Sequence, residues 1–255
     1  QRSILLVPEQ FTSSTEGRIY RELGDALSGM VESFSFTSLA KKILSTEGGA
    51  AVQTLSDAGR AVLVRRALEE LQDNVHYYHR HRRSAAFCQM AAQTIDELKS
   101  AGLSGQQLAQ LAGACGAESG KLSELALIFQ GYETLLARSG MDPSDRLELA
   151  GARLEEALAR HSLPEFLRDR AVFIDEFDTF NAPKKRLMGA MLAALPAVTV
   201  ALCEDGAPMQ PGDLELFSGA KQVAAQLRQL ARKNGAEVAV PQLLRKDLRH
   251  RNAPG

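Results

Sequence analysis

Two adjacent carboxylates, Asp175 and Glu176, are the side chains whose type and position best suit a chemical task. They follow the apolar run Val172–Ile174, which is typical of a buried strand in a parallel sheet. The carboxyl ends of such strands line the crevice in which α/β proteins bind ligands. In nucleotide hydrolases this is a Walker B arrangement, in which the Asp helps to hold Mg²⁺ and the Glu can polarise the attacking water. The alternative is an acidic pair at a solvated turn, because short motifs also arise by chance.

A Walker B strand implies a second motif, the loop G-x-x-x-x-G-K-[ST] that cradles the phosphates. The nearest match, Gly116–Leu122, has Cys115 where the first glycine belongs and Leu122 where the hydroxyl residue belongs. It lies between helical stretches and is interpreted as a helix–helix turn. We therefore expect this chain to bind neither ATP nor Mg²⁺, and we expect a phosphate loop, if the parent protein has one, to lie upstream of Gln1.

Positive charge and aromatic rings alternate in the segment His76–Arg83. Arginines can follow a nucleic-acid backbone and rings can stack on bases, so Arg80, Arg82 and Arg83 are candidate DNA-binding residues. The alternative is a solvated junction between two helices, because short basic runs commonly face water. The histidines have no Asp, Glu or Cys at ligand spacing, and no metal site is expected.

The composition of the whole chain limits the classes of protein to which it can belong. Its 255 residues, 45% hydrophobic and 24% charged, suffice for a sizeable core. The formal net charge of −1 means that nucleic-acid binding would depend on local clusters of basic residues, such as those at 184–186 and 245–251.

Three scattered cysteines argue against a zinc site, an iron–sulfur cluster and a disulfide framework, and they favour a reducing compartment, the cytoplasm. Without a long apolar run, neither a signal peptide nor a membrane span is expected.

The elements that must position these residues follow a β–α rhythm with one interruption. A strand at 4–7, buried on both faces, leads into a helix. This helix is expected to start with a capping box formed by Ser13 and Glu16. Its apolar stripe, Ile19, Leu23 and Leu27, is expected to pack on the sheet. A second strand at 31–36 is followed by a helix over 38–44 that ends at Gly48 and Gly49.

Helical stripes replace the strand pattern over about 55–165. Strands return at 171–174, 198–202 and 236–240, separated by helices around 186–195 and 223–230. The order predicts an α/β fold in which an all-helical insertion interrupts one parallel sheet. The expected division is 1–50 and 166–255 for the α/β core and 51–165 for the insertion.

Read in order, five segments resemble motifs of the first core domain of superfamily 1A DNA helicases of the UvrD/Rep kind: 4–12, 33–40, 141–147, 172–181 and 198–210. Within that group the chain is similar to the AddB/RexB subunit of the AddAB/RexAB helicase–nucleases. The segments that carry this similarity are Leu5–Thr12, Ser33–Leu39 with Thr46–Gly49, Val172–Phe180 and Gly212–Phe217.

The resemblance implies a P-loop NTPase-like sheet, corresponding to helicase domain 1A, with a 1B-like helical insertion. It also implies a partner of the AddA/RexA type that supplies the motor, ATP and Mg²⁺ in the parent complex, and DNA ends and single-stranded DNA as ligands. A nuclease domain with an iron–sulfur cluster would lie outside this chain, and no membrane would be involved.

Residue by residue, the resemblance places Asp175 and Glu176 in motif II, where glycine is expected instead of Glu176 in many AddB/RexB sequences. It implies contacts with single-stranded DNA for the loop residues Gln10, Phe11, Thr12, Thr37 and Ser38. The stretched motif III, Glu204–Gln210, argues against an active motor.

We therefore expect a helicase-like, motor-inactive N-terminal part of an AddB/RexB protein that acts in double-strand-break processing and homologous recombination repair. Two alternatives stay open. The chain could be part of an active superfamily 1 helicase with a catalytic motif II. It could also be an α/β interaction domain in which Asp175 and Glu176 only cap a turn.

Overall fold

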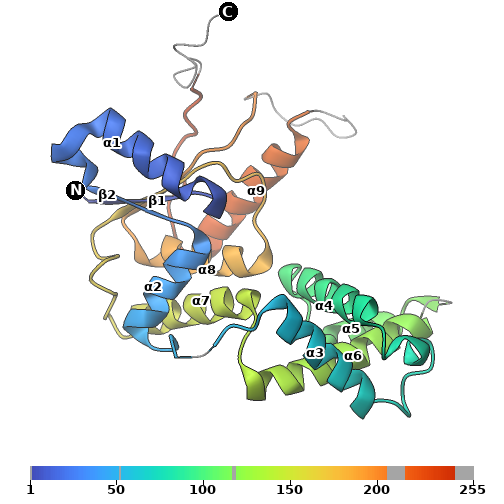
Figure 1. The fold of residues 1–255 in the computed structure, drawn as a ribbon. Coiled ribbons are helices and arrows are strands. Elements are labelled where there is room, and N and C mark those ends of the chain that lie inside the picture. Colours follow the sequence, from blue (N-terminus) through green and yellow to red (C-terminus); the bar gives the residue numbers. More distant parts are fainter. Residues whose placement is uncertain (1, 52, 117–118, 206–215, 245–255) are drawn as a thin grey trace, which may run out of the picture.

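The computed structural model describes residues 2–51, 53–116, 119–205 and 216–244 (Figure 1). Its elements, in chain order, are β1 (Ser3–Leu6), η1 (Glu9–Phe11), α1 (Thr12–Ser28), β2 (Val31–Phe34), α2 (Phe36–Glu47), α3 (Asp57–Glu70), η2 (His79–His81), α4 (Ala85–Ser100), α5 (Gly105–Ala112), α6 (Ser119–Ser139), α7 (Pro143–Ala159), β3 (Ala171–Ile174), α8 (Ala182–Ala194), β4 (Ala197–Val200) and α9 (Ser218–Lys233). None of the helices in these ranges has the length and apolarity that crossing a lipid bilayer requires.

The four strands form one parallel sheet in the order β2-β1-β3-β4. Their carboxyl ends are level, because Leu6 pairs with Phe34 on one side and with Ile174 on the other. Ile174 in turn pairs with Val200. The strands before and after the long helical stretch therefore lie side by side, and the predicted single parallel sheet is confirmed. The more specific helicase-like fold stays a prediction.

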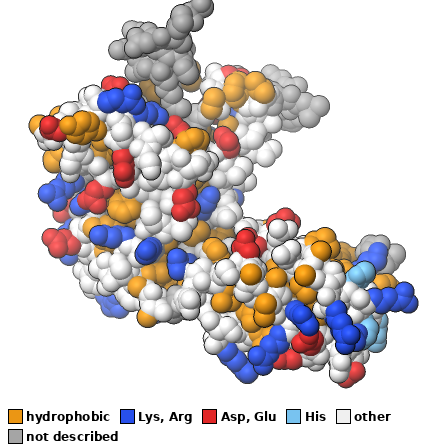
Figure 2. All heavy atoms as spheres, viewed as in Figure 1, with side chains coloured by type: hydrophobic (Ala, Val, Ile, Leu, Met, Phe, Trp, Pro, Cys, Tyr) orange, Lys and Arg blue, Asp and Glu red, His pale blue; other side chains and the backbone are white. Residues whose placement is uncertain are grey.

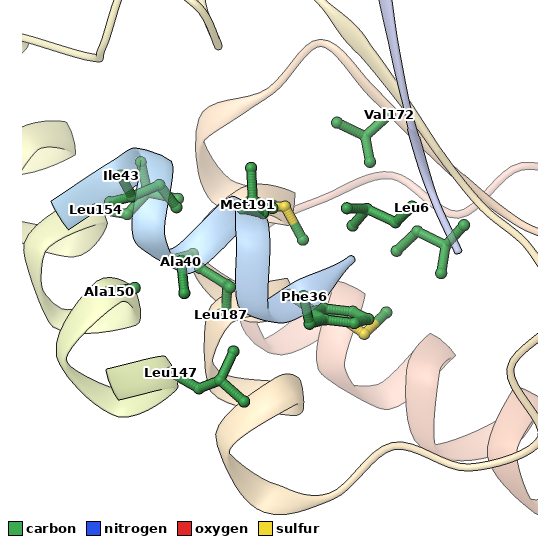
Figure 3. Packing of buried hydrophobic residues seen from close by; sticks show 14 of the residues in the cluster. Leu6, Phe36, Ala40, Ile43, Leu147, Ala150, Leu154, Val172, Leu187 and Met191 are labelled. Atoms are coloured by element: carbon green, nitrogen blue, oxygen red, sulfur yellow. The ribbon is translucent and has the colours of Figure 1, made fainter. Parts of the chain in front are cut away.

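One face of the two central strands, β1 and β3, is fully buried. Ile4, Leu6, Val172 and Ile174 are at most 1% exposed and pack with residues of α2, α7 and α8 (Figure 3). On the opposite face Phe173 is 43% exposed. The prediction of a first strand buried on both faces is wrong, since its burial alternates along the strand. The physical reason is the placement of the helices, because α1 contacts β2 on the side of the strands away from α2 and leaves β3 uncovered there (Figure 1).

Helix α1 departs from its predicted form at both ends. No side chain caps its N-terminus, and Glu16, predicted to close a capping box, instead accepts a hydrogen bond from Ser33 Oγ at 3.1 Å. Leu23 and Leu27, predicted to pack on the sheet, are 40% and 54% exposed. The backbone at Gly24 is non-helical (φ 70°, ψ 178°), so the helical period does not continue through this segment.

The boundary between β2 and α2 is set by a capping box that the sequence analysis missed. Ser35 Oγ accepts the Ser38 N–H at 3.1 Å, and Ser38 Oγ accepts the Ser35 N–H at 2.8 Å. These bonds start the helix at Phe36, so the predicted strand is two residues too long and the predicted helix starts two residues late. The helix ends at Glu47 and is terminated by Gly48, as predicted, where the backbone takes φ 94°.

The predicted last strand, 236–240, is wrong. This segment has no strand structure and pairs with no strand among the described residues. Val240 is 87% exposed. An apolar run of strand-like composition forms a strand only where a neighbouring strand supplies hydrogen-bond partners, and this run lacks one in the described part of the chain.

A second hydrophobic core lies within α3, α4, α5 and α6, which we call the helical block. The two chain segments that join it to the rest run side by side, since Leu55 N–H donates to Met141 O at 3.0 Å and Met141 N–H donates to Gln53 O at 3.1 Å. Gly140 allows this approach, because a Cβ there would lie 2.5 Å from Gln53 O. Helix α7 packs with α2 and α8 in the core under the sheet. The predicted division of the chain at residue 165 stays untested.

A buried polar cluster links the two cores, formed by Lys99, Tyr132, Asp142 and Asp145 and called here the Asp142 cluster. Asp142, at the start of α7, accepts hydrogen bonds from Tyr132 Oη at 2.6 Å and from Lys99 Nζ at 2.9 Å. Lys99 also pairs with Asp145 at 2.5 Å. Burial alone would lower the pKa of Lys99, but its bonds to Asp145 and Asp142 raise this pKa above its ordinary value. Burial, together with the bond to Asp142, raises the pKa of Tyr132.

Candidate functional site

Loops and helix N-termini converge where the strands end. Helix α1 follows β1 through η1, α2 follows β2 directly, and α8 follows β3. Backbone hydrogen bonds continue past the strands, from Val7 N–H to Phe34 O at 3.0 Å and from Asp175 N–H to Leu6 O at 3.0 Å. We call residues 7–12, 35–38 and 175–184 the sheet edge. The first turns of helices carry partial positive charge and N–H groups that suit an anionic ligand.

Asp175 and Glu176 lie at the sheet edge, as predicted from the strand that precedes them. Asp175 Oδ1 accepts the backbone N–H of Glu176 at 2.9 Å. The Glu176 carboxylate is paired with Arg18 of α1, with Oε1 and Nη1 3.3 Å apart. Its backbone is left-handed, with φ 66°, a conformation that favours glycine. The glycine that the family resemblance leads one to expect here therefore has a conformational explanation, which needs no argument about catalysis.

Sequence reasoning missed an aromatic and cationic cluster at the same edge. The rings of Phe36, Phe177 and Phe180 lie within 5.2–6.1 Å of one another, centroid to centroid. Lys184 Nζ lies 5.2 Å from the Phe177 centroid and 5.7 Å from that of Phe36. Burial lowers the pKa of Lys184. The basic run 184–186 has the composition of a solvated cluster, but Lys184 is half-buried over these rings and does not simply face water.

The start of α8 explains how Lys184 reaches this place. Asn181 caps the helix by accepting the Lys184 N–H at 3.1 Å, so the helix begins at Ala182 and not near residue 186. Lys184 therefore lies in the first turn and points over the rings. The Asn-Ala-Pro sequence, a capping residue with proline in the first turn, is the signal that could have located this helix start.

The five predicted DNA-contacting loop residues all lie at the sheet edge. Gln10 and Phe11 are exposed on η1, and Thr37 is exposed in the first turn of α2. Thr12 begins α1 and donates its hydroxyl to Glu9 O at 2.7 Å. The Ser38 hydroxyl takes part in the capping box, so its structural role is clear. A role in binding DNA stays a prediction for all five.

Arg80, Arg82 and Arg83 lie elsewhere, at the junction between α3 and α4 that contains η2. Arg82 contacts the ring of His79. Figure 2 shows histidines and basic side chains gathered at the end of the helical block that lies away from the rest of the molecule. These three residues therefore do not join the sheet edge in one site.

The residues present at the sheet edge do not suit the binding of a nucleotide with Mg²⁺. The carboxylate pair there has one member directed at Arg18, and within the described ranges no glycine-rich phosphate loop lies beside it. The nearest match, 116–122, falls between α5 and α6, with 117–118 outside the described residues. No three His, Cys, Asp or Glu side chains in the part of the chain that the structure describes are arranged to hold a metal ion.

Several predicted features fall outside the described residues. They are the loop 206–212 with Gln210 of the stretched motif III, most of the segment Gly212–Phe217, and the basic cluster 245–251.

Comparison with known proteins gives a consistent result. A family model described as "ADDB, N-terminal" matches residues 1–254. The chain is 34% identical over 246 residues to the B subunit of the ATP-dependent helicase/deoxyribonuclease of Desulforudis audaxviator, which covers 93% of this chain and 20% of that protein. The proteins of the same name from Moorella thermoacetica and Symbiobacterium thermophilum are each 31% identical, covering 92% and 98% of this chain and 21% and 22% of those proteins. The chain thus spans about a fifth of the length of the curated relatives it matches.

Proposed function

Because this chain belongs to the AddB N-terminal family, we propose that it is the DNA-handling part of the B subunit of an ATP-dependent helicase/deoxyribonuclease. The complex would process double-strand breaks for homologous recombination repair in the cytoplasm. A partner of the AddA/RexA type would supply the motor, and ATP and Mg²⁺ would act there. The chain itself would bind and guide single-stranded DNA without hydrolysing ATP.

The observation that carries this proposal is the convergence of exposed side chains with helix N-termini at the sheet edge. Phe11 is 40% exposed, and an exposed ring can stack on any base. No side chain caps α1, which begins at the next residue. The Thr12 N–H already donates to Glu9 O, so the attraction of this helix start for phosphate rests on the partial positive charge of its first turn. Gln10 on η1 and Thr37 in the first turn of α2 add polar groups.

The absence of a motor role is supported by the surroundings of the carboxylate pair. Glu176 is held toward Arg18, although a catalytic Glu would have to face an attacking water. The sequence contains no glycine-rich loop that could hold the triphosphate. Phosphoryl transfer would also need an arginine finger from a further domain or another protein of the complex.

The test is binding of a dye-labelled oligothymidylate, followed by fluorescence anisotropy at several salt concentrations. Phe11→Ala should weaken binding by roughly tenfold, since stacking on an aromatic ring contributes about 1–3 kcal/mol per base. Phe173→Ala is the matched control, because that ring is similarly exposed, at 43%, on the open face of the sheet. Affinity should also fall steeply as salt increases.

Three outcomes would contradict the proposal. If Phe11→Ala and Phe173→Ala changed the affinity for the oligonucleotide equally, the sheet edge would not be the binding site. No binding at low salt would favour the interaction-domain alternative. ATP turnover by the purified chain would favour the active helicase.

A further inference from the structure

Aromatic side chains line a groove at the end of the helical block. This tip groove has a volume of about 440 Å³, within the range of small-ligand sites. The residues that matter for its chemistry are Tyr77, Tyr78, His81, Phe87, Met90 and Lys121. None of them belongs to the sheet edge.

The rings of the tip groove form a near-parallel array. Phe87 lies 5.4 Å from Tyr78 and 5.5 Å from His81, centroid to centroid, with interplanar angles of 29° and 30°. Tyr77 and Met90 are 58% and 56% exposed. In the array, Tyr78 and Phe87 are half-buried and His81 is exposed, and a flat ring surface that is partly open to solvent suits a further flat, aromatic ligand.

A buried carboxylate fixes the chain segment that carries the two tyrosines. Glu124 of α6 is 6% exposed and accepts the backbone N–H groups of His76 at 2.7 Å, Tyr77 at 2.9 and 3.0 Å, and Tyr78 at 3.2 Å. The Tyr77 ring lies close to Gly120, where a Cβ would be 3.0 Å from the ring. The groove is therefore formed before a ligand arrives, which reduces the entropy cost of binding.

The charge around the tip groove indicates which flat ligand fits. Arg80 and Arg83 flank the groove residue His81 in the chain and are exposed, and neither forms an ion pair with any residue that the structure describes. Lys121 lies at the groove itself. Stacking surfaces next to exposed arginines are the combination that proteins use for single-stranded nucleic acid.

We propose that the tip groove holds a nucleobase of single-stranded DNA, stacked against Tyr77 and the Phe87 array, with the neighbouring phosphates on Arg80 and Arg83. The choice of DNA rests on the function proposed above. The site is separate from the sheet edge and gives the same strand a second point of contact.

The chain contains no tryptophan, so Tyr77→Trp places a single fluorescent reporter in the groove. Oligothymidylate should quench this reporter and bind roughly tenfold more tightly than an abasic oligonucleotide of equal length. Both ligands carry the same phosphate charge, so the difference measures base stacking. Val62→Trp, on α3 at a side chain that is 63% exposed and outside the groove, is the control reporter and should not respond.

Two further variants separate stacking from charge. Phe87→Leu on the reporter background keeps an apolar side chain but removes the ring, and it should reduce the preference for thymidylate over the abasic ligand several-fold. Arg80→Gln combined with Arg83→Gln should weaken both ligands by a similar factor and make binding less sensitive to salt. An unfolding curve for each variant checks that the fold is retained.

The proposal is overturned if the abasic ligand quenches Tyr77→Trp as strongly as thymidylate does. It is also overturned if anisotropy shows bound oligonucleotide while the reporter stays unquenched. Its failure differs from failure of the proposed function, because Phe11→Ala reports on the sheet edge and Tyr77→Trp on the tip groove.

Discussion

At position 176 the backbone and the side chain favour different residues. The left-handed backbone, with φ 66°, favours glycine, whereas the carboxylate gains a partner in Arg18, whose side chain is half exposed. Exposed ion pairs contribute between zero and about 1 kcal/mol. A left-handed residue with a Cβ costs about 1–2 kcal/mol. The backbone term is therefore the larger of the two.

We predict that Glu176→Gly is more stable than Glu176→Ala by about 1 kcal/mol. Both substitutions remove the carboxylate, and only alanine keeps the Cβ, so the comparison isolates the conformational cost. Urea unfolding of the two variants measures it. Equal midpoints would show that the backbone relaxes at this position and that the preference for glycine needs another cause.

Only those residues of the candidate site that belong to a local sequence pattern were predictable. Asp175 could be placed because it follows a buried strand. The pairing of Glu176 with Arg18 spans 158 positions and leaves no periodic signal. The same holds for Lys184, which looks like one of three solvated basic residues until the rings of Phe36 and Phe177 are known to lie beneath it.

At the scale of elements, the sheet is stabilised mainly from one side. Ile174→Ala should lower the free energy of unfolding by about 2–5 kcal/mol, because the side chain is 1% exposed and its loss leaves a cavity. Phe173→Ala should cost clearly less, although it removes a larger side chain, since the ring is already 43% exposed. Chemical denaturation compares the two neighbours. Losses of similar size would mean that both faces of β3 are covered.

The order of the elements was predictable, but their ends and burial were not. The runs at 4–7 and 171–174 locate β1 and β3, because continuous apolar segments flanked by turn residues are typical of parallel strands. Whether both faces of such a strand are covered depends on where the helices pack, which the run itself does not encode. Likewise, the run at 236–240 resembles a strand in composition and finds no partner among the described strands.

At the scale of the whole molecule, the Asp142 cluster couples the two cores. Lys99 has a pKa raised above its ordinary value of 10.5. Its charged form therefore stabilises the folded chain. This contribution is complete below pH 10.5 and is lost as the pH rises through the raised pKa of the folded state.

Lys99→Met should therefore destabilise the chain at neutral pH by about 3 kcal/mol, because it leaves a buried carboxylate without its cation. The difference from the parent chain should shrink above pH 10.5. Urea unfolding across this range measures it. Arg66→Met removes an exposed pair with Glu70 and should show a small difference that does not change with pH. A constant deficit for Lys99→Met would mean that its ammonium group is not what holds the cluster.

The two chain segments that join the helical block to the rest of the molecule run side by side at Leu55 and Met141. This arrangement has a consequence for the exchange of such blocks between proteins. The helical block enters and leaves through neighbouring backbone positions joined by a 3.0 Å hydrogen bond, and insertions with adjacent ends are the kind that domains tolerate. A short turn could replace the whole block without stretching the sheet. The host would then lose the ammonium and phenol groups that satisfy Asp142 and the Asp96 carboxylate that accepts the Ser144 hydroxyl, so a transplanted block must bring those groups with it.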